Sequence, residues 1–72
     1  MAREREIINH VRRYRRQQDE MTQQELADRV GVSRQTVLSI EGGRYNPSVG
    51  LALQIAQVFD VTVETLFEVK EG

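Results

Sequence analysis

The segment from Gln23 to Ile40, QQELADRVGVSRQTVLSI, constrains the fold more than any other part of the chain. Its apolar residues recur at intervals of three and four, so they fall on one face of a helix in each half of the segment. Gly31 stands between the halves, where a left-handed turn requires a residue without a β-carbon. The pattern predicts two short helices joined by a sharp turn. Their inward residues are Leu26, Ala27, Val30, Val32, Val37 and Ile40.

Capping residues mark where both helices begin. Thr22, with Glu25 three residues later, has the form of a capping box. Ser33 is a suitable N-cap for the second helix. We therefore expect helices over 23–30 and 34–41.

The wider stretch MTQQELADRVGVSRQTVLSIEGGRYNPS resembles the helix-turn-helix of the Xre family, the phage-repressor type. Its parts TQQELA, VGVSRQTV and IE-x-G-R-Y-NPS occur in the family's order and spacing. LALQIAQVFDVTVETLF is similar to the family's last two helices, so the resemblance covers roughly residues 7–69. It implies an all-α, five-helix DNA-binding fold forming a single domain over 1–72. The motif lies in 23–41 and the recognition helix in about 34–41.

The remaining helices are expected at 10–17 or 10–18, at 49–59, and at 63–66 or 63–67. Their N-caps are Asn9, Ser48 and Thr62. The helix over 49–59 is apolar almost all round, which predicts a central, buried helix. Its apolar residues are Leu51, Leu53, Ile55, Ala56, Val58 and Phe59.

Two connections call for unusual backbone. Gly42 and Gly43 are expected to end the recognition helix with left-handed conformers. Asp19 and Glu20 stand in a loop where related sequences usually carry a glycine, and the loop looks one residue longer. The geometry of that turn is left open.

Polar side chains follow the cap of the recognition helix. Arg34 can pair with guanine or bind a phosphate, Gln35 can pair with adenine, and Thr36 can form a hydrogen bond or contact a thymine methyl. Gln23, at a helix N-terminus, suits a phosphate or is simply exposed. Tyr45 contacts the DNA backbone or packs at the edge of the core. The DNA-contact set that the resemblance implies is Gln23, Ser33, Arg34, Gln35, Thr36, Ser39, Arg44, Tyr45 and Asn46.

The resemblance also implies an ion pair between Arg15 and Glu41, holding the first helix against the recognition helix. Leu38 is an apolar residue on a face expected to be exposed, where it contacts thymine methyls or packs at the helix edge. His10 is the only histidine, and we expect it to be structural or on the surface.

Other arginines could assist DNA binding or could belong to a solvated surface. Three follow the start of the first helix: Arg12, Arg13 and Arg16. Arg3 and Arg5 lie in the tail MARERE, which is a solvated tail or an arm touching the DNA backbone.

The end of the chain, FEVK, alternates apolar and charged residues, as a half-exposed strand does. The chain resembles a short, cytolysin-repressor-like branch of the family, whose end segments pair as an antiparallel sheet. This implies that 7–9 pairs with 67–69, and that residues 62–70 form a two-fold dimer. The expected interface residues are Leu66, Phe67 and Val69, with the end of helix 49–59. A frayed tail is the alternative.

The composition argues against several classes of site and location. The 72 residues contain no cysteine, so no disulfide or thiolate metal site is expected. No apolar run is long enough for a membrane span, and the charged N-terminus is unlike a signal peptide, which favours a cytoplasmic protein. We expect no cofactor, no metal, no small-molecule ligand and no catalytic constellation.

The net charge of −1 conceals an asymmetry. Residues 1–44 hold nine arginines and seven acids, a balance of +2, whereas residues 45–72 hold one lysine and four acids, a balance of −3. Local charge of this kind matters more than net charge for attracting DNA.

We therefore expect a sequence-specific, homodimeric regulator that binds double-stranded DNA, with repression as the expected outcome. An antitoxin or a restriction controller would use the same DNA-binding fold. A protein-interaction module that kept the fold is the alternative from another class.

Overall fold

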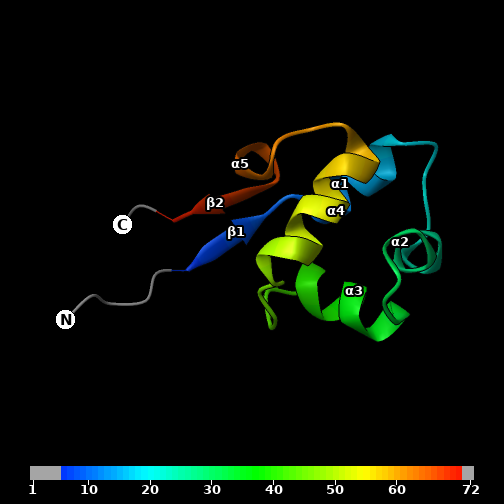
Figure 1. Cartoon of the computed structure of the whole chain (residues 1–72), viewed down its shortest axis with the longest axis horizontal. Helices are drawn as coiled ribbons and strands as arrows, with labels where there is room; N and C mark the ends of the chain where they lie inside the picture. Colours follow the sequence, from blue (N-terminus) through cyan, green and yellow to red (C-terminus); the bar gives the residue numbers. More distant parts are fainter. Residues whose placement is uncertain (1–5, 71–72) are drawn as a thin grey trace.

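The computed structural model describes residues 6–70, so Arg3 and Arg5 lie outside the described part of the chain. Figure 1 shows a group of helices from which two paired strands extend. In chain order the elements are β1 (Ile7–Asn9), α1 (Val11–Gln17), α2 (Gln23–Val30), α3 (Arg34–Glu41), α4 (Val49–Phe59), α5 (Val63–Leu66) and β2 (Phe67–Val69). Within residues 6–70 this is the expected five-helix fold with a small antiparallel sheet, so the predicted fold class is confirmed.

The two strands join the ends of the described chain. β1 and β2 pair antiparallel, with Ile7 opposite Val69 and Asn9 opposite Phe67. Backbone hydrogen bonds of 2.9 Å from His10 N to Leu66 O and from Lys70 N to Glu6 O extend the ladder. The predicted pairing of 7–9 with 67–69 is confirmed, and the frayed tail is excluded.

One hydrophobic core lies among the helices. Tyr14 of α1 stacks on Phe59 of α4 with ring centroids 6.1 Å apart. The inward residues predicted for α2 and α3 are buried, except that Val32 in the turn is partly buried against the core. The buried set is Val11, Met21, Leu26, Ala27, Val30, Val37, Ile40, Ala52, Ile55, Ala56, Phe59 and Leu66.

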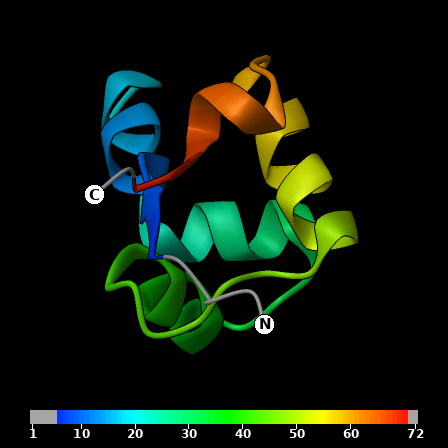
Figure 2. The ribbon, with the colours of Figure 1, turned by 90° about the vertical axis from the view of Figure 1, so that its left-hand side faces the viewer.

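The prediction that α4 is a central, buried helix is wrong. Val49 is 77% exposed and Leu53 is 50% exposed, whereas Ile55 is 1% exposed. Helices α1, α2 and α5 pack on α4 and leave one of its faces uncovered. Figure 2 shows α4 at the edge of the helical group rather than at its centre. The apolar composition of α4 therefore exceeds what this protomer buries.

Hydroxyl caps begin four helices as predicted. Thr22, Ser33, Ser48 and Thr62 each accept a hydrogen bond from the backbone N–H three residues later, and Thr22 and Glu25 form the complete capping box. The expectation for α1 is wrong by one residue. His10 is its N-cap, and Asn9, which precedes it, belongs to β1.

In the described part of the chain, positive φ angles occur at three residues other than glycine: Asp19 (51°), Glu20 (49°) and Asp60 (55°). The longer loop after α1 thus turns through two successive left-handed residues that carry side chains. Of the two glycines after α3, only Gly43 is left-handed, with φ of 77°, because Gly42 keeps helical angles. The prediction for Gly42 is therefore wrong.

Candidate nucleic-acid interface

Helix α3 has one buried and one exposed face. Val37 and Ile40 are each 1% exposed, whereas Arg34 and Gln35 are exposed. Figure 1 shows α3 along the lower edge of the molecule, with no other element outside it. The N-cap Ser33 accepts a hydrogen bond from the Thr36 N–H over 3.1 Å, which fixes the first turn. A short helix with a rigid start and a polar outer face is the form that enters a DNA major groove.

The loop after α3 extends this face. The Arg44 N–H donates to Ser39 O over 3.0 Å, which ties the start of the loop to the helix. Gln35, Thr36, Ser39 and Tyr45 then surround an open hollow of about 300 Å³. Tyr45 is 45% exposed, so its ring and hydroxyl stay accessible from outside. Four residues of the predicted DNA-contact set are thus brought together, and Arg44 and Asn46 lie exposed on the same loop.

Three helices meet at the far end of α3. Arg15 of α1 donates to Glu41 from Nε over 2.7 Å and from Nη2 over 3.2 Å. Its third donor, Nη1, binds Met21 O over 2.7 Å. The side chains of Arg15 and Glu41 are only 11% and 6% exposed. The ion pair that the resemblance implied is therefore present, and it holds α1 against α3.

Gln23, the first residue of α2, joins the same cluster. Its Nε2 donates to Glu41 Oε1 over 3.1 Å. The side chain is half-buried rather than fully exposed. Glu41 thus orients Gln23 beside the N-terminus of α2, where unpaired backbone N–H groups favour an anion.

Leu38 lies in the groove where these helices meet. Arg12, Arg15, Gln23, Leu38, Glu41 and Gly42 line this groove, whose volume is about 350 Å³. Leu38 is half-buried, so packing between α1 and α3 accounts for an apolar residue on this side. Arg12 is exposed at the same groove, which places one cation of the first helix near Gln23.

The start of α2 also carries the one perturbed carboxyl group resolved in the described residues. Thr22 N donates to Glu25 Oε1 over 2.9 Å. This backbone hydrogen bond, with a smaller contribution from the Thr22 hydroxyl, holds the pKa of Glu25 below its ordinary value of 4.5. Glu25 therefore stabilises the N-terminus of α2 and takes no part in the surface of α3.

The prediction that Leu66 lies at the dimer interface is wrong. Its side chain is 0% exposed, because α5 turns it into the core before the chain continues as β2. Phe67 is half-buried and Val69 is 48% exposed, so both retain surface for a partner. His10, expected to be structural or on the surface, lies 3.0 Å from Glu68 of β2 through its Nε2.

Two features were missed at the sequence level. Asn9 Nδ2 donates to Ile40 O over 2.9 Å, across 31 residues of sequence. No local pattern signals this contact, since Asn9 is equally typical of an N-cap. The second feature is the exposed apolar face of α4. Because the sequence of α4 is apolar almost all round, its pattern does not show which face stays uncovered.

The profile of the Helix-turn-helix family matches residues 11–66. This chain belongs to the Xre-type helix-turn-helix family. The match spans all five helices described above, and such proteins are DNA-binding transcriptional regulators. Among residues 6–70, no helix of this helix-turn-helix protein has the length and apolar run needed to cross a membrane.

Relatives carry the same description. An uncharacterized HTH-type transcriptional regulator of Archaeoglobus fulgidus is 55% identical over 47 residues, which are 65% of this chain and 66% of that protein. Another from Methanocaldococcus jannaschii is 47% identical over 55 residues, covering 76% and 83% respectively. The matched segments span about two thirds of the Archaeoglobus protein and most of the Methanocaldococcus one.

Two solved structures resemble the fold. ClgR of Corynebacterium glutamicum, a clp gene regulator, superposes with a TM-score of 0.70 at 25% identity, over 76% of this chain and 57% of that chain. A candidate DNA-binding protein from Bacteroides fragilis gives 0.76 at 19% identity, over 86% and 98%. The second likeness concerns the fold alone.

Proposed function

We propose that this helix-turn-helix protein is a homodimeric repressor that reads a near-palindromic operator through the major groove. The supporting observation is the outer face of α3, where Arg34 and Gln35 are exposed opposite the buried Val37 and Ile40. Because the buried face of the helix is held by packing, its polar side chains can be aligned with the edges of the bases.

The base-reading residues in this proposal are Arg34, Gln35, Thr36 and Ser39. Arg34 donates to guanine O6 and N7, and Gln35 pairs with adenine N6 and N7. Thr36 and Ser39 line the hollow beside Gln35, where a thymine methyl group fits. Ser33 caps the helix at the point where it enters the groove.

The backbone contacts come from both ends of the motif. Gln23 and the N-terminal amides of α2 bind a phosphate on one side, and Arg44, Tyr45 and Asn46 bind the DNA backbone on the other. These contacts set the register of the protein but carry no sequence information.

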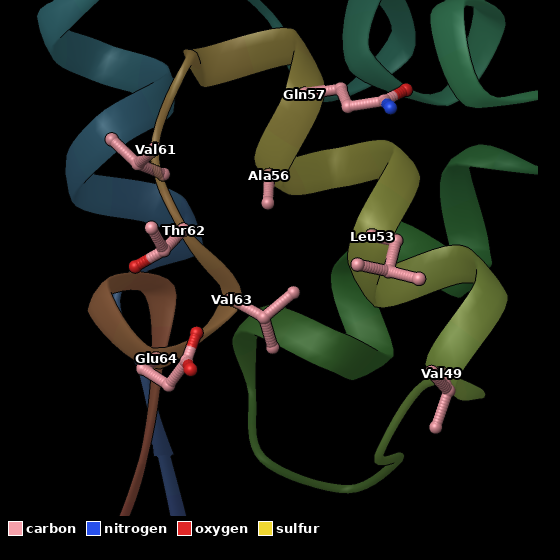
Figure 3. A pocket seen from close by; sticks show the side chains of 8 residues that line it. All are labelled: Val49, Leu53, Ala56, Gln57, Val61, Thr62, Val63 and Glu64. Atoms are coloured by element: carbon pink, nitrogen blue, oxygen red, sulfur yellow. The ribbon is translucent and has the colours of Figure 1, made fainter.

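The second subunit is proposed to bind at the surface formed by β2 and α4. Phe67 and Val69 would contribute from β2, and Ile7 and Val49 lie along the same apolar hollow as Phe67. Figure 3 shows the adjoining groove between α4 and α5, about 500 Å³ in volume. Leu53 and Val63 point toward it from opposite sides, and Glu64 is the only charged side chain among the described residues that line it. A mostly apolar surface of this kind suits association.

A two-fold dimer would present two copies of α3 to successive major grooves, about 34 Å apart, so the operator would be a near-palindrome. Repression follows if the operator overlaps a promoter.

The test begins with selection of bound duplexes from a random library. Gel-shift titrations on the selected site and on a scrambled duplex are then run at several salt concentrations. We expect tighter binding to the selected site and weaker binding as salt rises. Equal affinity for both duplexes, or no response to salt, would contradict DNA recognition by α3.

Dimerisation is tested separately by sedimentation equilibrium. We expect the wild type to dimerise and Val69→Lys, at a half-exposed position of β2, to weaken the dimer. Gln24→Lys, on the exposed face of α2, is the control and should dimerise normally. A monomeric wild type at micromolar concentration, both free and on DNA, would contradict the homodimer.

A further inference from the structure

Asn9 contacts three elements at once. Its backbone belongs to β1, where it lies opposite Phe67. Its side-chain Nδ2 donates to Ile40 O near the end of α3 over 2.9 Å. Its Oδ1 accepts from the Val11 N–H at the start of α1 over 3.4 Å. Because both halves of the amide are used, its orientation is fixed.

The acceptor of this bond lies at a critical point of the recognition helix. Ile40 is 1% exposed, so water has little access to its carbonyl oxygen and could not readily replace the Asn9 donor. The same oxygen accepts from the Gly43 N–H over 3.0 Å, and Gly43 begins the turn to Arg44 and Tyr45. Asn9 therefore stabilises both the end of α3 and the start of the loop beside it.

The other polar side-chain contacts of the two-stranded sheet do not involve α3. Glu68 contacts His10, and Lys70 contacts Glu6 over 3.2 Å. Within residues 6–70, Asn9 alone supplies a side-chain hydrogen bond from the strands to α3. One side-chain amide thus links the two-stranded sheet to the recognition helix by a hydrogen bond.

We infer that Asn9 is a positioning residue, which sets the recognition helix relative to the two-stranded sheet and, through Phe67, relative to the second subunit. This inference rests on the proposed function, because it assumes that α3 reads bases and that the sheet contacts a second copy. Base contacts need a helix held within about half an ångström, and they carry the sequence information, whereas non-specific binding depends on charge attraction to the phosphates. Loss of the Asn9 bond should therefore reduce sequence discrimination more than general affinity for DNA.

The principal variant is Asn9→Asp, which keeps the shape and replaces the donor with an oxygen facing the Ile40 carbonyl. We expect its affinity for the selected site to fall roughly three- to tenfold, as for one lost hydrogen bond. Its affinity for a scrambled duplex and the slope of binding against salt should stay unchanged. The matched control is Gln17→Glu, which adds the same charge at an exposed position at the end of α1, outside the proposed DNA and dimer surfaces, and should bind both duplexes as the wild type does.

A merely structural role gives a different result. If Asn9 only stabilised the fold, binding measured well below the unfolding temperature would be unchanged, or would fall equally for both duplexes. Either outcome would overturn the inference. Asn9→Ala, which adds no charge, is measured in parallel in case Asn9→Asp does not fold.

Amide hydrogen exchange of the DNA-free protein provides an independent measurement. We expect the Gly43 N–H to exchange faster in the Asn9 variants, while the N–H of Ile55 in α4 keeps its protection. Unchanged exchange at Gly43 would show that Asn9 does not hold the end of α3. Failure of the proposed function is seen differently, as equal binding of both duplexes by the wild type.

Discussion

Arg15 and Glu41 join the first helix to the last residue of the recognition helix through two hydrogen bonds, of 2.7 and 3.2 Å. Both side chains are almost covered, and Gln23 adds a third donor to the same carboxylate. The pair therefore fixes α3 against α1 and orients the start of α2.

Removing one partner of this pair should reduce the free energy of unfolding. Arg15→Met leaves the Glu41 carboxylate covered and without its cation, and we expect a loss of about 3–5 kcal/mol in the free energy of unfolding. Urea unfolding followed by circular dichroism measures this loss. In the double variant Arg15→Met/Glu41→Leu most of the stability should return, because no unpaired charge remains. A loss below about 1 kcal/mol for Arg15→Met would contradict the structural role of the pair.

The capping box predicts a specific dependence of stability on pH. Hydrogen bonds from Thr22, chiefly from its backbone N–H, lower the pKa of Glu25 below 4.5 in the folded chain. The unfolded state then binds more protons, so this contribution to stability is present above pH 4.5 and is lost as the pH falls through the lowered pKa. Glu25→Gln keeps a side-chain acceptor but cannot titrate. We expect the wild type to exceed the variant in urea midpoint at pH 7 and to approach it at low pH. A constant difference would refute the assignment.

Replacing Glu20, in the loop after α1, with glycine should stabilise the folded protein. Glu20 has φ of 49°, a conformation that costs a residue with a side chain roughly 1–2 kcal/mol. Glu20→Gly removes that cost but adds backbone entropy to the unfolded chain, so we expect a net gain of about 0.5 kcal/mol. Gln54→Gly, at an exposed helical position of α4, is the control and should lose about 1 kcal/mol. Urea unfolding of both variants gives the comparison, and destabilisation by Glu20→Gly would contradict it.

Two leucines near the proposed dimer surface should respond differently to truncation. Leu66→Ala removes a side chain that is 0% exposed and should cost about 2–5 kcal/mol in the free energy of unfolding. Leu53 is 50% exposed, so Leu53→Ala should cost less than about 1.5 kcal/mol. The measurement is made at a protein concentration where sedimentation shows monomer, since dimerisation would add to the apparent stability. Equal losses would mean that α5 does not bury Leu66 in the protomer.

The proposed DNA contacts separate into two kinds. Gln35→Ala should cost about 1–3 kcal/mol on the selected operator and relax the preference at one base position. Arg44→Ala should weaken binding to all duplexes by a similar factor and reduce the salt dependence. Competition gel shifts with single-base operator variants measure both effects. A uniform loss for Gln35→Ala would refute its base-reading role.

Much of the fold could be predicted because its signals are local. The hydroxyl caps at Ser33, Ser48 and Thr62 and the turn at Gly31 set the helix boundaries within a few residues of sequence. The polar face of α3 follows from the spacing of Val37 and Ile40 alone. The pairing of the strands was predicted through the family resemblance, since four alternating residues are too few to indicate it by themselves.

The wrong predictions concern which side chains the tertiary structure buries and which backbone angles it imposes. Leu53 and Leu66 are equally apolar in sequence, yet one is half-exposed and the other fully buried. Gly42 and Gly43 are likewise the same residue type, but only Gly43 adopts positive φ, because α3 continues through the angles of Gly42.

The sequence by itself determined where α2 to α5 begin and end and which side of α3 stays polar, because caps and helical periodicity act between residues no more than one or two turns apart. Only the tertiary structure decided that Asn9 binds Ile40, that Gln23 joins the Arg15–Glu41 pair, and that one face of α4 remains open. Those contacts connect residues 18 or more positions apart. They depend on how the helices pack, which no local pattern specifies.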